Sequence, residues 1–147
     1  EGTVELPEVE FNAACNPEAV GKVTDVLLAI HENTAQIIDA RPAARFNAEV
    51  DEPRPGLRRG HIPGALNVPW TELVREGELK TTDELDAIFF GRGVSYDKPI
   101  IVSCGSGVTA AVVLLALATL DVPNVKLYDG AWSEWGARAD LPVEPEK

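Results

Sequence analysis

The sequence predicts an α/β domain in which helices cover both faces of a mostly parallel central sheet of about five strands. Short apolar runs typical of buried strands alternate along it with longer segments of helical character. Such alternation indicates βαβ units, whose strands lie parallel. The length of 147 residues, with 45% hydrophobic and 25% charged residues, is that of one ordinary globular domain.

The first part of the chain predicts a leader and then a helix and a strand. Residues 1–19 are acidic, carry two prolines and lack periodicity, so we interpret them as a leader or interdomain linker and residues 20–147 as the domain. A helix is expected next, with Thr24 as its cap. The apolar run at 36–39 predicts a buried strand. Residues 41–64 are rich in Pro, Gly and Arg and predict a long loop, with a short helix near 43–46.

The second part of the chain repeats the alternation. Residues 65–68 predict a strand, and Thr82 begins a helix that the glycines at 91 and 93 end. Residues 99–103 form a clear buried strand, and the almost wholly apolar stretch 108–120 predicts a helix that is buried on most sides. A last strand is expected at 125–128, followed by a turn.

The composition excludes several classes of protein. A net charge of −11, from 13 Lys and Arg against 24 Asp and Glu, argues against nucleic-acid and anionic-membrane partners. No apolar run approaches the length that spans a bilayer. Two cysteines indicate reduced thiols and a cytoplasmic location. Because the chain has no Met and begins with Glu1, we expect that it was processed or cut from something longer.

A cysteine that follows a buried strand is the strongest candidate for chemistry. Ligands of open α/β sheets bind at the carboxyl ends of the strands, which here brings together Asp39, Arg41, Cys104 and Asp129. A glycine-rich turn and a helix follow Cys104. The N–H groups of such a turn form an anion cradle, and the start of a helix adds partial positive charge. Both stabilise a thiolate, so Cys104 is predicted to be a nucleophile.

The segment around Cys104 is open to other interpretations. Cys104 is alternatively an inert buried thiol. The glycines at 105 and 107 with Ala110 fit a dinucleotide fingerprint, but too few strands follow. A cysteine phosphatase needs a phosphate-gripping arginine where this chain has Ala110. A cysteine protease needs a base beside the thiol, which sequence does not show. No metal site is expected, because no Cys pair and no His spacing resembles a zinc site; for His61 we expect a structural hydrogen bond.

The long loop concentrates positive charge in an otherwise acidic chain, in the form of Arg41, Arg45, Arg54, Arg58 and Arg59. Surface arginines are usually solvated charges. Arg45 and Arg54, however, lie in the segment that leaves a predicted strand end. Since a guanidinium grips a carboxylate with two hydrogen bonds, a small anionic substrate held beside a thiolate is a coherent site.

These residues together resemble the rhodanese superfamily. The chain is similar to the C-terminal, catalytic domain of its two-domain sulfurtransferases over nearly all of residues 20–143. The resemblance rests on Asp39-Ala40-Arg41, Arg45-Phe46, Glu52-Pro53-Arg54, the segments at 60–65 and 67–69, the Cys104 loop, and the Tyr-Asp-Gly-Ala-Trp-Ser-Glu-Trp run at 128–135. It implies a rhodanese-like three-layer fold.

The loop sequence separates two branches of the superfamily. Thiosulfate-preferring members resemble Cys-Arg-Lys-Gly-Val-Thr, whereas this chain has Cys104, Gly105, Ser106, Gly107, Val108 and Thr109, as in the 3-mercaptopyruvate branch. A neutral loop suits a monoanionic α-keto acid. The resemblance implies that Arg45 and Arg54 bind its carboxylate, and that Ser106 hydrogen-bonds the reacting thiol or the developing enolate.

The implied activity is sulfur transfer from 3-mercaptopyruvate through a Cys104 persulfide to cyanide, a small thiol or a thioredoxin-like protein. It requires no metal and no organic cofactor. The alternatives are thiosulfate:cyanide sulfur transfer, and a persulfide-carrier or regulatory module without efficient turnover of small donors. The resemblance also implies a partner, a linked N-terminal rhodanese-like domain. Cys15 is expected to be an inert linker thiol, with a regulatory disulfide to Cys104 as the alternative.

Overall fold

Five parallel strands form the centre of the molecule. The computed structural model describes residues 8–14 and 16–145. The strands run in the order β1-β7-β6-β2-β3, and every pairing between them is parallel. Their bounds are Val20–Gly21 for β1, Gln36–Asp39 for β2, Leu66–Asn67 for β3, Ile100–Ser103 for β6 and Val125–Tyr128 for β7. The predicted parallel sheet of about five strands is confirmed.

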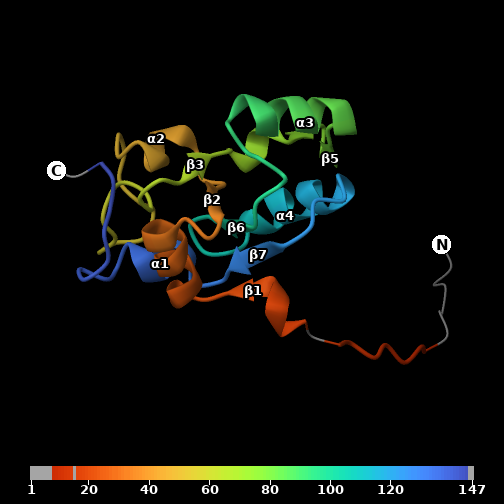
Figure 1. Cartoon of the computed structure of the whole chain (residues 1–147), viewed down its shortest axis with the longest axis horizontal. Helices are drawn as coiled ribbons and strands as arrows, with labels where there is room; N and C mark the ends of the chain where they lie inside the picture. Colours follow the sequence, from red (N-terminus) through yellow and green to blue (C-terminus); the bar gives the residue numbers. More distant parts are fainter. Residues whose placement is uncertain (1–7, 15, 146–147) are drawn as a thin grey trace, which may run out of the picture.

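Helices cover both faces of this sheet (Figure 1). Helices α1 (Val23–Glu32) and α5 (Ala131–Trp135) pack on one face, and α3 (Thr82–Gly91) and α4 (Ala110–Thr119) on the other. Successive strand residues point to opposite faces, so Ile37 and Ile101 lie in the core beneath α1 and α5. Their neighbours Ile38 and Val102 lie in the core beneath α3 and α4. The predicted three-layer arrangement is confirmed.

Most helices and strands lie close to the residues predicted for them, but the starts of two helices differ from the prediction. The short helix α2 spans Ala43–Phe46, as expected. Helix α1 does not have Thr24 as its cap: Lys22 is the N-cap, and the Asp25 carboxylate accepts a hydrogen bond of 2.7 Å from the Lys22 N–H group. Helix α4 begins at Ala110 rather than at residue 108, because the preceding residues belong to the Cys104 loop.

Several short elements carry no sequence pattern and were not predicted. They are the edge strand β1, the antiparallel hairpin of β4 (Val74–Arg75) and β5 (Glu78–Leu79), and two 3₁₀ helices, η1 (Pro17–Ala19) and η2 (Trp70–Glu72). Each strand has two residues, too few for an apolar alternation to be visible. Residues 8–14 lead away from the body of the molecule (Figure 1). Cys15, and with it both interpretations of that thiol, lies outside the described residues.

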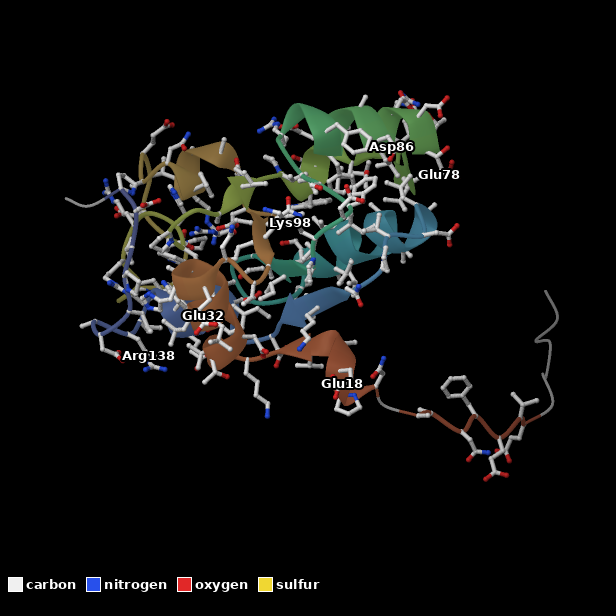
Figure 2. All side chains as sticks on the ribbon, in the orientation of Figure 1. Glu18, Glu32, Glu78, Asp86, Lys98 and Arg138 are labelled. Atoms are coloured by element: carbon white, nitrogen blue, oxygen red, sulfur yellow. The ribbon has the colours of Figure 1, made fainter. Side chains whose placement is uncertain are left out.

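The acidic side chains that Figure 2 labels come from separate elements: Glu18 from η1, Glu32 from α1, Glu78 from β5 and Asp86 from α3. Among the described residues, no helix is both long enough and apolar enough to cross a bilayer.

Candidate active site

The carboxyl ends of β2 and β6 lie side by side, because Asp39 pairs with Ser103 in the parallel register. Cys104 comes directly after β6, and its side chain is 1% exposed. The thiol therefore lies beneath the surface, in the apolar cluster that also contains Ala110 and Val113 of α4. Cys104 thus lies at the carboxyl edge of the sheet, where the sequence predicts it, and its role as a nucleophile stays a prediction.

Helix α5 fixes the direction of the loop backbone. The Trp132 N–H group donates to the Cys104 carbonyl at 2.9 Å, and the Ser133 N–H group donates to the Gly105 carbonyl at 3.0 Å. In a trans peptide the C=O and the following N–H point in opposite directions. Because two successive carbonyls face α5, the N–H groups of Gly105 and Ser106 point away from it.

These loop amides are available for an anion. Among the described residues, none of the backbone N–H groups from Gly105 to Thr109 donates a hydrogen bond. Gly107 has φ +85° and lies against Asp129, so that a Cβ there would be 3.3 Å from the Asp129 carbonyl oxygen. A run of N–H groups without an acceptor from the protein, beside a thiol, favours a bound negative charge.

Helix α5 is itself held firmly. The Tyr128 hydroxyl donates to Glu134 Oε2 at 2.6 Å, and burial, followed by this hydrogen bond, raises the pKa of Tyr128. The Trp132 indole N–H donates to the Arg58 carbonyl at 2.9 Å. Arg58 in turn donates to four backbone carbonyls at and after α5, those of residues 135, 136, 138 and 141. Helix α5, which orients the Cys104 loop, is therefore held in place by several hydrogen bonds.

A pocket of about 250 Å³ opens beside the loop. Five of the predicted site residues line it, together with Glu52, Pro53 and Leu57; the five are Arg45, Arg54, Gly105, Ser106 and Thr109. Val108 points elsewhere and is 73% exposed. The structure thus brings both predicted arginines and the hydroxyl-bearing part of the loop to one concave surface.

Arg41 is structural. It is 1% exposed and lies with its guanidinium carbon 4.3 Å from the centre of the Trp132 ring. It donates to the Asp39 carboxylate at 2.6 Å, to Glu52 Oε1 at 2.8 Å and to the Gly60 carbonyl at 2.7 Å. With all three guanidinium nitrogens hydrogen-bonded in the interior, Arg41 holds the strand end and the long loop together instead of facing a substrate.

The two pocket arginines differ in their partners. Arg45 forms an ion pair with Glu52, which also accepts from Arg41, so its charge is partly balanced. Its guanidinium lies against the loop, since a Cβ at Gly105 would be 2.8 Å from one of its nitrogens. Arg54 instead donates to the Ser133 hydroxyl at 2.6 Å. Across the residues that the structure describes, no carboxylate pairs with Arg54.

The five arginines of the long loop therefore have different surroundings in the folded domain. Arg58 binds backbone carbonyls and Arg59 pairs with Asp51 on the surface, which leaves Arg45 and Arg54 at the pocket. Two residues that reasoning from the sequence missed complete the site, Glu52 and Ser133. Both lie in segments that carry the resemblance, and Glu52 is also an acidic residue in an arginine-rich loop. The sequence assigns no role to Ser133, because its partners are distant in sequence.

A second, larger cavity of about 530 Å³ lies at the other end of the sheet, where the amino ends of β6 and β7 meet η1 and α1. Its ionisable lining includes Asp25 and Lys126, which pair with each other at 3.5 Å. No arginine is among its described lining residues. Of the two cavities, the smaller one is lined by residues that the sequence predicts for the site, and it lies beside the Cys104 loop although Cys104 is not among its lining residues.

Histidines and acids do not form a metal site here. Within residues 8–14 and 16–145, no group of three or more His, Cys, Asp or Glu is arranged to hold a metal ion. His61 stacks on Phe46 with 3.7 Å between ring centres, and its Nδ1 lies 2.8 Å from the Phe46 carbonyl oxygen. The predicted structural hydrogen bond of His61 is confirmed.

Comparisons with known proteins agree with this geometry. The model of the rhodanese-like domain family matches residues 22–138. The 3-mercaptopyruvate sulfurtransferase of Escherichia coli (strain K12) is 96% identical over 147 residues, which are 100% of this chain and 52% of that protein. The 3-mercaptopyruvate sulfurtransferase of Rattus norvegicus is 41% identical over 131 residues, 88% of this chain and 44% of that protein.

Solved structures show the same fold. The crystal structure of SseA from Escherichia coli, described as having the "Rhodanese" fold of 3-mercaptopyruvate sulfotransferases, is 93% identical with a TM-score of 0.74. The match covers 91% of this chain and 50% of that one. The chain thus spans about half the length of the curated relatives it matches.

Proposed function

This chain belongs to the rhodanese-like domain family, and on that premise we propose that it is the catalytic domain of a 3-mercaptopyruvate sulfurtransferase. Residues 20–147 form this domain and residues 1–19 act as a linker. The observation that carries the proposal is a buried cysteine on a loop whose backbone N–H groups donate to no acceptor among the described residues, beside a pocket lined by two arginines.

The first half-reaction loads Cys104. Its thiolate attacks the sulfur of 3-mercaptopyruvate and forms an S–S bond, while the carbon–sulfur bond breaks and its electron pair leaves with the pyruvate enolate. The enolate takes up a proton and departs as pyruvate. Arg45 and Arg54 bind the carboxylate, and Ser106 hydrogen-bonds the reacting sulfur or the enolate oxygen. The loop N–H groups stabilise the negative charge of the persulfide.

The second half-reaction unloads Cys104. An acceptor, either cyanide, a small thiol or a reduced thioredoxin-like protein, attacks the outer sulfur and releases the Cys104 thiolate. This is covalent catalysis in two steps, with the cysteine as the group that carries sulfur between them. In the assembled protein, a linked N-terminal rhodanese-like domain is the proposed partner. A cytoplasmic location, expected from the cysteine count, stays a prediction.

The charge of the pocket supports a monoanionic donor. Arg45, Glu52 and Arg54 together contribute a net charge of about one positive unit, since Glu52 pairs with Arg45. The loop residues that line the pocket, Gly105, Ser106 and Thr109, are neutral. A single carboxylate of an α-keto acid balances this charge, whereas a dianion such as thiosulfate brings one negative charge too many.

Intact-mass measurement after brief incubation with 3-mercaptopyruvate tests the proposal. We expect the chain to gain one sulfur atom, and cyanide to remove it. Cys104→Ser abolishes the gain, whereas the matched Cys15→Ser variant keeps it, because these are the two cysteines of the chain. Loading by thiosulfate in preference to mercaptopyruvate identifies a thiosulfate sulfurtransferase. Failure of both donors, with loading from a persulfide-bearing protein, identifies a carrier module.

A further inference from the structure

One hydroxyl joins the predicted carboxylate clamp to the active-site loop. The Ser133 Oγ lies 2.6 Å from an Arg54 nitrogen and 2.6 Å from the Gly105 carbonyl oxygen. A guanidinium only donates and a carbonyl only accepts, so the direction of both bonds is fixed. The hydroxyl accepts a hydrogen bond from Arg54 and donates its single O–H to the Gly105 carbonyl.

The same residue binds Gly105 twice. Its backbone N–H donates to the Gly105 carbonyl at 3.0 Å in addition to the hydroxyl bond. Ser133 therefore directs the Gly105–Ser106 peptide, whose N–H faces away from α5 and belongs to the loop cradle. A bond from a charged donor polarises the hydroxyl and strengthens the bond that the hydroxyl donates in turn.

Arg54 depends on this contact for its position. Its side chain is exposed, and within the described chain it has no carboxylate partner that would hold it. A long exposed side chain loses rotamer entropy when it is fixed, and Ser133 offsets part of that loss before the substrate arrives. Arg45, by contrast, is held by Glu52 and has no contact with Ser133 that the structure records.

We infer that Ser133 is a positioning residue, which holds Arg54 at a fixed place relative to the Cys104 loop so that a carboxylate bound at Arg54 lies in register with the reacting sulfur. The inference rests on the proposed function for the identity of that carboxylate. Ser133 touches neither the substrate nor the thiol in this account; it acts through Arg54 and Gly105.

A pair of variants of equal shape isolates the hydroxyl. Ser133→Thr keeps the hydroxyl and Ser133→Val replaces it by a methyl group, so both carry the same branched side chain. The probe is pyruvate, whose Kd is measured calorimetrically without any sulfur transfer. We expect Ser133→Val to weaken pyruvate binding about three- to tenfold relative to Ser133→Thr, the range of one ordinary hydrogen bond.

A double-mutant cycle separates positioning from a loss of structure. In the Arg54→Gln background the Thr and Val variants are expected to differ much less in pyruvate binding, because the bond between the hydroxyl and the guanidinium is gone and only the bond to the Gly105 carbonyl still distinguishes them. Thermal unfolding of every variant checks that the fold persists. Equal binding by Thr and Val in the parent chain overturns the inference, as does the same Val deficit in both backgrounds, or no measurable pyruvate binding at all.

The two hypotheses fail differently. If mercaptopyruvate does not load Cys104 but pyruvate binding depends on Ser133 and Arg54 together, the proposed function is wrong and the inference stands. If loading occurs and the Thr and Val variants behave alike, only the inference is wrong.

Discussion

Removing the guanidinium of Arg41 is expected to destabilise the domain severely. Arg41→Met keeps an apolar stem of similar length against Trp132 and eliminates the contacts to Asp39, Glu52 and Gly60. Glu52 retains its ion pair with Arg45. Asp39, 2% exposed, keeps the Arg41 backbone N–H at 2.9 Å but no cation.

The size of the expected loss of stability follows from the buried charge of Asp39, which is left without a cation. Breaking a buried ion pair by removing one partner lowers the free energy of unfolding by about 3–5 kcal/mol, because it leaves a buried charge without compensation. Domains of this kind have a total of about 5–15 kcal/mol. A loss of about 4 kcal/mol, at an m-value of about 2 kcal/mol per molar urea, lowers the unfolding midpoint by about 2 M.

Urea unfolding at neutral pH measures this effect. The matched control is Arg75→Met, which removes a bidentate pair with Glu84 at the surface and is expected to shift the midpoint far less. The double variant Asp39→Asn/Arg41→Met, with the orphaned charge also removed, is expected to recover part of the loss. If Arg41→Met shifts the midpoint no more than Arg75→Met, the account of Arg41 as a structural residue is refuted.

Three further predictions follow from the site and the core. Arg54→Gln raises the KM for 3-mercaptopyruvate about tenfold or more, the worth of a charged hydrogen bond, and changes thiosulfate use less; equal losses contradict the carboxylate clamp. Burial raises the pKa of both tyrosines, Tyr96 and Tyr128, so ultraviolet titration of the native chain shows little tyrosinate near pH 10. The stability that both tyrosines contribute below that pH is lost as the pH rises further. Titration of the folded chain with ordinary tyrosine pKa values contradicts this prediction. Gly60→Ala lowers the free energy of unfolding by about 1–3 kcal/mol, because at φ +110° the new Cβ meets the Glu144 carbonyl. Gly77→Ala is the control: at φ +87°, with no atom within 4 Å of the new Cβ, it lowers the free energy of unfolding less in the same thermal unfolding measurements.

The parts of the fold that the sequence predicts best are those with a long local pattern. Strands β2, β6 and β7 each have four residues, and β6 is buried at every position, so its apolar run is visible in the sequence. Strand β1 has two residues, and it exists because Val20 pairs with Leu127, which lies near the other end of the sequence. The start of α1 was misplaced because its cap uses a carboxylate from within the helix, at Asp25, that reaches back to Lys22.

The site divides in the same way. Cys104 and its glycines are contiguous, and the topology of a parallel sheet places such a loop at a strand end, so sequence alone identifies them. The function of each arginine depends on its partner instead. Arg41 and Arg45 share Glu52, and Arg54 meets Ser133, 79 positions further along the chain. Only the folded chain distinguishes the arginine of the core from those of the pocket.

The contact between α5 and the Cys104 loop also sets an order in time. The ribosome makes residues 104–109 before β7 and α5, so a nascent chain exposes the cysteine while the groups that orient its loop do not yet exist. Carbonyls at 104 and 105 find their donors at Trp132 and Ser133 only after β7 has joined the sheet. The loop around Cys104 is therefore oriented in the same step that closes the domain.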